Sequence, residues 1–149
     1  MFVGQFLSYQ QVGCAMEVRL HRDPCNEIGT VALREMEWLL DHLRSNQDYR
    51  ALIWYSDRER GFSAGADLRE LHAGLMERRA GSIGGRVLRK LPTRLRKRVA
   101  QPLIQREIGV FVDRIHRVFD GFDTLDRLTV AVTHGVVFGG GFELSLIHI

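Results

Sequence analysis

Two clusters of small residues, each ending in an acidic side chain and a leucine, are the parts of this sequence best suited to chemistry. Residues 61–68 have the sequence GFSAGADL, and residues 135–144 have the sequence GVVFGGGFEL. Small residues let a ligand approach the backbone closely. A helix that begins after such a turn leaves its first N–H groups free, near the positive end of its dipole. Each cluster could therefore offer an N–H to a developing negative charge, and the two together could serve one oxyanion.

Together the two clusters resemble the signature segments of the crotonase (enoyl-CoA hydratase/isomerase) superfamily. Residues 62–68 match the pattern F-x-A-G-A-D-[LI], and residues 135–144 match G-x-x-x-G-G-G-x-E-L, in the family's order. The chain's first predicted strand and the predicted helix after Asp23–Asn26 also resemble the family's beginning. The resemblance implies an α/β fold, the ββα spiral of crotonases, of which this chain would hold only the N-terminal portion.

The resemblance also implies a site for an acyl-CoA thioester. The backbone N–H groups of Ala66 and Gly140 would form an oxyanion hole for the thioester enolate, with Glu143 as general acid/base. The residues expected to contact substrate are Ala64, Gly65, Asp67, Leu68 and Gly139. For Glu143, the alternative is a helix first-turn glutamate with no chemical role. For Asp67, a plain helix cap or first-turn acid is an equal alternative. His134 stands where the family carries asparagine, and a loop-supporting role is favoured over a catalytic one.

The implied function is that of an enoyl-CoA hydratase or isomerase, in which the substrate carries the coenzyme A and no further cofactor is expected. Alternatives are a family lyase, dehydratase or thioester hydrolase with the same oxyanion hole, or a non-catalytic acyl-CoA-binding relative. Family hydratases use a second acid further along the chain, beyond Ile149. Relatives commonly form trimers or pairs of trimers, so the full-length protein is expected to be a homo-oligomer.

Hydrophobic periodicity predicts the elements that position the first cluster. Ala15–His21 alternates like a half-buried strand, Ile28–Arg44 has the spacing of an amphipathic helix, and Ala51–Tyr55 is typical of a buried strand. Asn26 is expected to cap the helix. This β–α–β order favours a parallel pair of strands with a right-handed crossover.

The pattern of the second half of the sequence predicts fewer strands and more helix. Residues 56–65 are expected to form a polar loop, 67–75 and 106–119 to form helices, and 128–132 to form a strand. The three glycines within 80–85 are expected to break structure.

A basic insertion at about 77–105 separates the two clusters. Between Glu77 and Arg117 lie twelve of the 21 Lys and Arg residues but only three of the 18 Asp and Glu residues. The segment lengthens the interval between Ala66 and Gly140 beyond that of short family members. A solvated helical face is the favoured interpretation, and an anion-facing surface or lid over the CoA site is the alternative.

Composition restricts the class of protein. The 149 residues, 45% hydrophobic and 26% charged, suit one globular domain. No secretory signal or membrane-length apolar run is evident, so a cytoplasmic location without a membrane span is expected, with Cys14 and Cys25 reduced. No metal-ligand spacing is present. Aromatic residues do not interleave the arginines, which argues against nucleic acid as a partner.

The last six residues, 144–149, have the sequence LSLIHI in place of the family's continuation. The reading frame CTG TCT CTT ATA CAC ATC encodes this string and resembles a transposon-end adapter used in sequencing libraries. The hypothesis is that residues 1–143 are a partial crotonase-like domain and that 144–149 are a non-native tail. A natural but divergent end is the alternative.

Overall fold

The computed structural model describes residues 1–81 and 93–147 of the chain. The chain forms two compact units. The first unit comprises Met1–Asp67 and Ile115–Ile149, and it contains every strand among the described residues. The second unit comprises Leu68–Arg114, whose described residues are mainly helical.

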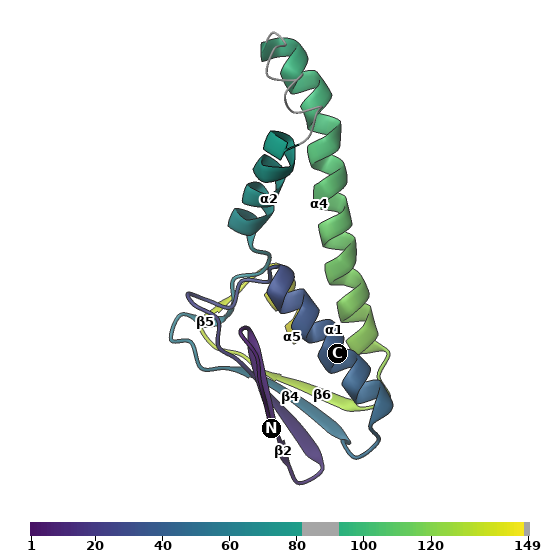
Figure 1. The fold of residues 1–149 in the computed structure, drawn as a ribbon. Coiled ribbons are helices and arrows are strands. Elements are labelled where there is room, and N and C mark those ends of the chain that lie inside the picture. The colour runs from purple at the N-terminus through teal and green to yellow at the C-terminus, as the bar shows by residue number, and fades with distance from the viewer. Residues whose placement is uncertain (82–92, 148–149) are drawn as a thin grey trace. The chain divides into compact units, whose positions relative to one another are not determined.

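A five-stranded sheet in the order β1-β2-β3-β4-β6 lies at the centre of the first unit (Figure 1). Its strands are β1 (Phe2–Val3), β2 (Leu7–Val12), β3 (Ala15–Leu20), β4 (Ala51–Ser56) and β6 (Leu128–Val132). The first three pair antiparallel, whereas β3, β4 and β6 pair parallel. The predicted parallel β–α–β unit is therefore confirmed, and β1 and β2 are additions that the sequence pattern did not predict.

One face of the sheet is buried under helices. Helix α1 (Thr30–Ser45) contributes six buried side chains: Ala32, Leu33, Met36, Leu39, Leu40 and Leu43. They share the core with alternate strand residues, which include Met16, Val18, Leu20, Leu52 and Trp54. The Trp54 ring meets the edge of Phe122 at a centroid distance of 5.1 Å. This alternation confirms the half-buried strand predicted from period-two spacing.

The opposite face of β6 is open in this structure. Leu128, Val130 and Val132 alternate along the strand and are 64%, 41% and 54% exposed. β6 is also the edge strand of the sheet. An apolar edge strand of this kind offers a surface for association.

Asn26 does not cap α1, so that prediction is wrong. Helix α1 begins at Thr30, and Gly29 is its N-cap residue. Asn26 is instead fully buried with a φ of 51°, a left-handed conformation that asparagine tolerates better than most residues. It uses its side chain to join loops, as described below.

A second, two-stranded sheet carries the first cluster beside the second one. β5 (Gly61–Ser63) pairs parallel with β7 (Val136–Val137), and α5 (Gly140–Ser145) follows directly. The loop predicted over 56–65 therefore contains the short strand β5. β5 has three residues and β7 has two, which are too few for a periodic pattern in the sequence.

The second unit is more helical than its sequence pattern predicts. Helix α2 (Leu68–Gly81) extends past the predicted end and includes Ala80 and Gly81, so the expected break does not begin there. Helix α4 (Thr93–Asp123) begins in this unit, contains Pro102 and ends in the first unit. Residues 82–92 of the basic insertion lie outside the described residues. No described helix is long and apolar enough to cross a membrane.

Candidate functional site

The two small-residue clusters meet because β5 and β7 are paired. Phe62 N–H donates to His134 O, and Phe138 N–H donates to Ser63 O, both at 2.9 Å. The two strands run parallel, so the turns that follow them leave the small sheet at the same edge. A pairing between segments more than 70 residues apart thus brings the two predicted donors into one region.

Close backbone contact explains two of the glycines. A Cβ atom on Gly65 would lie 2.7 Å from Phe138 O and 3.3 Å from Gly140 N, and the φ of Gly65 is 84°. A Cβ atom on Gly141 would lie 2.6 Å from the Cβ of Ser63. Neither position has space for a side chain, so the two turns pack backbone against backbone.

Ala66 presents the one unpaired N–H in its turn. Ala64 N–H donates to Cys25 O at 2.8 Å, Gly65 N–H donates to Ser63 Oγ at 3.1 Å, and Asp67 N–H donates to Ile28 O at 2.9 Å. Ile28 N–H in turn donates to Gly65 O at 2.7 Å, which makes a parallel bridge centred on Ala66. In this bridge the central residue uses neither its N–H nor its C=O, and Ala66 N–H has no acceptor among the described residues.

Gly140 presents an equivalent donor at the start of α5. Gly141 N–H donates to Phe138 O, while the N–H groups of Phe142 and Glu143 donate to Gly139 O. Gly139 is the N-cap residue, with a φ of 49°. Gly140 N–H makes no hydrogen bond within the part of the chain that the structure describes, as expected for the first turn of a helix.

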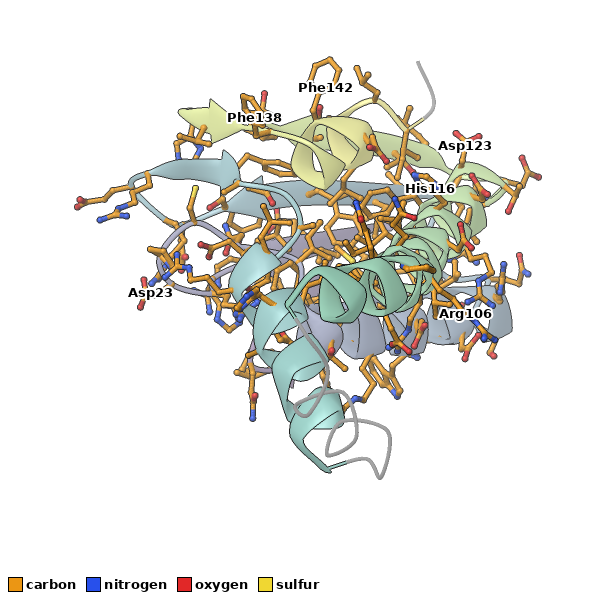
Figure 2. All side chains as sticks on the ribbon, turned by 90° about the horizontal axis from the view of Figure 1, so that it is seen from above. Asp23, Arg106, His116, Asp123, Phe138 and Phe142 are labelled. Carbon is orange, nitrogen blue, oxygen red and sulfur yellow. The ribbon has the colours of Figure 1, made fainter. Side chains whose placement is uncertain are left out.

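Glu143 lies in the first turn of α5 with its carboxylate half exposed. Its Oε2 atom is 3.7 Å from Nε2 of His116, which lies on the final turns of α4. This distance is within ion-pair range but too long for a hydrogen bond. Figure 2 shows His116 on α4. It also shows Phe138, which directly follows β7, and Phe142 on α5 projecting outward, where they are 73% and 53% exposed.

A buried polar network holds the first cluster in place. Asn26 Nδ2 donates to Phe62 O and to Ser56 Oγ, both at 2.8 Å, and Ser63 Oγ donates to Asn26 O at 2.8 Å. The Arg22 guanidinium donates to Asp67 Oδ2 at 2.6 Å. Buried polar groups satisfied in this way fix a loop in one conformation.

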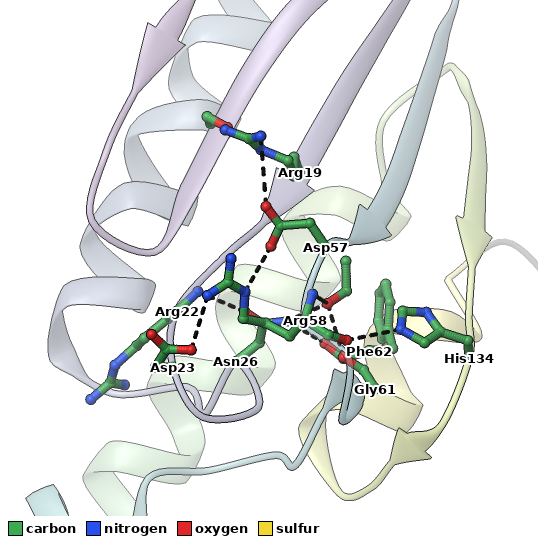
Figure 3. Close-up of polar contacts among 11 residues, drawn as sticks. Arg19, Arg22, Asp23, Asn26, Asp57, Arg58, Gly61, Phe62 and His134 are labelled. Atoms are coloured by element: carbon green, nitrogen blue, oxygen red, sulfur yellow. Dashed lines mark hydrogen bonds and ion pairs between the residues drawn. The ribbon is translucent and has the colours of Figure 1, made fainter.

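A second set of ion pairs lies beside this network (Figure 3). Arg58 donates to Asp57 Oδ1 at 2.8 Å and to Asp23 Oδ1 at 2.9 Å, and Arg19 pairs with Asp57 at 3.6 Å. Partial burial opposes ionisation of Asp57. The hydrogen bond and charge of Arg58, with smaller effects of Arg19 and His21, outweigh it and hold the pKa of Asp57 below its ordinary value.

His134 supports the loop that carries these ion pairs. Its Nε2 lies 2.9 Å from Arg58 O (Figure 3), and an N–H at that nitrogen would donate to the carbonyl. This contact agrees with the favoured loop-supporting interpretation of His134 and gives the ring a partner other than a substrate.

The structure brings together most of the residues that the sequence singled out. Ala64, Gly65, Ala66, Asp67, Gly139, Gly140 and Glu143 lie on the two adjoining turns and on α5. Leu68 is the exception, because it is the first residue of α2, belongs to the second unit and is 71% exposed.

Sequence analysis missed three residues that contact the site. Arg22 and Asn26 precede α1, and His116 lies on α4, so each is far from the clusters along the chain. The buried state of Asn26 and the partner of Arg22 depend on tertiary contacts, and no local pattern signals them. No group of three or more metal-ligating side chains occurs among the residues that the structure describes.

Comparisons with known proteins point to one kind of fold. No family model matches the chain. The human enoyl-CoA hydratase domain-containing protein 2, mitochondrial, is 26% identical over 121 residues, and the bovine protein of the same name is also 26% identical. The match covers 81% of this chain and 32% of the human protein, so the chain spans about a third of the length of the curated relatives it matches.

Solved structures give the same result over more of the chain. An enoyl-CoA hydratase from Geobacillus kaustophilus superposes with a TM-score of 0.69 at 20% identity, covering 98% of this chain and 44% of that protein. An enoyl-CoA hydratase from Bacillus anthracis gives a TM-score of 0.65 at 25% identity, covering 96% of this chain and 45% of that protein. The predicted α/β fold, present as less than half of its relatives' length, is therefore confirmed.

Proposed function

Because this chain belongs to the crotonase (enoyl-CoA hydratase/isomerase) superfamily, we propose that its protein processes an acyl-CoA thioester by stabilising the thioester enolate. The observation that carries the proposal is the pair of unpaired N–H groups on Ala66 and Gly140, on two turns in backbone contact. A thioester oxygen that accepts both hydrogen bonds gains stabilisation as its negative charge grows. Loss of one such donor typically costs about 2.7–4 kcal/mol in the transition state.

Glu143 is the proposed general acid/base. It follows the Gly140 donor by three residues on α5, so its carboxylate and the second amide share one short helix. In a hydratase, this carboxylate takes a proton from water as the water oxygen bonds to the β-carbon and the enolate forms. Transfer of that proton to the α-carbon then discharges the enolate and restores the carboxylate. An isomerase would instead move one proton between carbons through the same enolate.

The substrate carries the coenzyme A, and no other cofactor enters the proposed reaction. Ala64, Gly65, Asp67, Leu68 and Gly139 are the proposed substrate contacts, of which the small residues are those that permit close approach. A homo-oligomeric assembly, as a trimer or hexamer, is part of the proposal for the whole protein.

The test is turnover of crotonyl-CoA by the protein that carries this chain, followed as loss of the enoyl absorbance. Glu143→Gln should abolish most of the turnover, because the amide cannot exchange a proton at neutral pH. Glu17→Gln is the matched control, since Glu17 lies on β3 and its carboxylate accepts a hydrogen bond from Gln10 on the neighbouring strand. Binding of an acyl-CoA without turnover of crotonyl-CoA would instead favour a lyase, dehydratase or thioester hydrolase, or a non-catalytic binding role.

A further inference from the structure

The Arg22 side chain joins the two backbone segments that pair at the bridge between Ile28 and Ala66. Its Nη2 donates to Asp67 Oδ2 at 2.6 Å, and its Nη1 donates to Glu27 O. One guanidinium thus holds the residue before Ile28 and the residue after Ala66. The planar fork of arginine suits this double contact, because it places donors on two separate nitrogens, whereas a lysine has all three of its donors on one nitrogen.

The peptide between Gly65 and Ala66 transmits this restraint to the proposed donor. Gly65 O accepts Ile28 N–H at 2.7 Å, which fixes the carbonyl end of the peptide. The peptide is planar and trans, so its N–H points away from Ile28. Any slip of Ala66 along Ile28 would therefore turn the direction of the Ala66 N–H.

The backbone of Arg22 is also held in place by a hydrogen bond. Its backbone N–H donates to Oδ1 of buried Asn26 at 2.8 Å, and Asn26 in turn holds Phe62 O. The Arg22 and Asp67 side chains are 29% and 11% exposed, so water screens the pair only in part. An ion pair so placed is weak evidence for a role in stability, because desolvation offsets much of its attraction.

We propose that Arg22 is a positioning residue that holds the Ala66 N–H in the direction needed to bind a thioester oxygen. This inference rests on the proposed function and assigns a role to a residue outside both signature clusters. Arg22 touches neither the substrate nor the reacting atoms. It acts through Asp67 and Ile28 on the amide that does.

The first test needs no substrate and compares amide hydrogen exchange at Ile28 and Asp67, whose N–H groups make the two hydrogen bonds of the bridge around Ala66, in the whole protein. Arg22→Gln should speed exchange of both amides relative to the parent. The control is Arg19→Gln, which removes a more exposed arginine from an ion pair with Asp57 on the same segment. Equal exchange in Arg22→Gln and the parent would overturn the proposal, whatever reaction the protein performs.

The second test measures polarisation of a bound thioester carbonyl, from the infrared carbonyl stretch of an unreactive acyl-CoA. Arg22→Gln should return the stretch toward its value in water and lower kcat roughly tenfold to a hundredfold, with a smaller change in KM. Arg22→Lys should restore part of both effects. Glu143→Gln should lower kcat with the carbonyl stretch unchanged, because it leaves both donors in place.

The two tests separate failure of the inference from failure of the proposed function. A parent protein that binds no acyl-CoA contradicts the proposed function, and the exchange data at Ile28 and Asp67 still decide whether Arg22 orders the bridge around Ala66. If Arg22→Gln does not fold, Asp67→Asn removes the same charge pair from the other side and should give the same exchange changes, in a measurement that needs no substrate. A variant with normal polarisation but lower thermal stability would reduce Arg22 to a structural residue.

Discussion

Gly141 illustrates how little room single residues have at the junction of the two turns. A Cβ atom there would meet the backbone and side chain of Ser63 at 2.6–2.9 Å. Gly141→Ala should therefore destabilise the fold by about 1–3 kcal/mol through overpacking, measured from urea unfolding midpoints. Gly109→Ala is the control, because nothing lies within 4 Å of its Cβ and it is helical. That variant should be neutral or slightly stabilising, and equal effects of both would contradict the packing argument.

Asp57 should make stability depend on acid pH. Its pKa is lowered in the folded protein, so the ionised form stabilises the fold above the ordinary pKa of 3.8, and this contribution is lost as pH falls through the folded pKa. Asp57→Asn should therefore be less stable than the parent at pH 7, with the difference shrinking in acid. Asp48→Asn, which removes an exposed carboxylate, is the control. A constant difference across pH would exclude the ionised group as its cause.

His116 should affect activity only modestly. Its Nε2 is 3.7 Å from the Glu143 carboxylate, and both side chains are about half exposed. Exposed pairs are worth about 0–1 kcal/mol, so His116→Gln should change kcat/KM by less than about fivefold. A loss as large as that of Glu143→Gln would instead show that His116 takes part directly in proton transfer.

The residues chosen from the sequence were those with local signatures. Gly65, Ala66, Gly140 and Glu143 could be selected because glycine-rich turns and first-turn acids follow from neighbouring residues. The Arg22–Asp67 pair spans 45 positions, and Asp67 had been weighed only as a cap or a substrate contact. Contacts of this kind depend on the packed fold, so sequence reasoning could not find them.

Elements were predictable in proportion to their length and periodicity. Helix α1 and strands β4 and β6 have clear apolar patterns, and their predicted limits agree with the structure within two residues. β5 has three residues and β7 has two, and each is a strand only because it pairs with the other. Such a pairing between distant segments leaves no local pattern in the sequence. The basic insertion at about 77–105 has many charged residues and no periodic apolar pattern. Its role as a solvated helical face or as an anion-facing surface stays a prediction.

The end of α4 should be anchored by Phe122. This side chain is fully buried and packs edge-on against Trp54, so Phe122→Ala should cost about 3–5 kcal/mol of stability. Phe142→Ala removes a ring that is 53% exposed and is the control. Denaturant unfolding followed by tryptophan fluorescence measures both. A cost for Phe122→Ala no greater than for the control would mean that α4 does not pack here in solution.

At the scale of the whole molecule, the 149-residue chain by itself exposes an apolar surface. Leu128, Val130 and Val132 on β6 are joined by Phe138 and Phe142, all more than 40% exposed. We expect the isolated chain to bind the dye ANS and to self-associate, because edge strands and apolar patches favour both. Val130→Lys with Val132→Lys should reduce both signals. A monomeric chain that binds no dye would contradict the exposure of this face.

The pairing of β5 with β7 has a consequence for how the length of chain between the two turns can vary. The second unit, Leu68–Arg114, falls in sequence wholly between the two turns and contributes no strand to the pairing among its described residues. The entropy lost on closing a flexible loop grows only with the logarithm of its length, by about 0.6 kcal/mol per doubling. Genetic insertions can therefore accumulate in this interval at little thermodynamic cost, while the register of five strand residues keeps the two amide donors together.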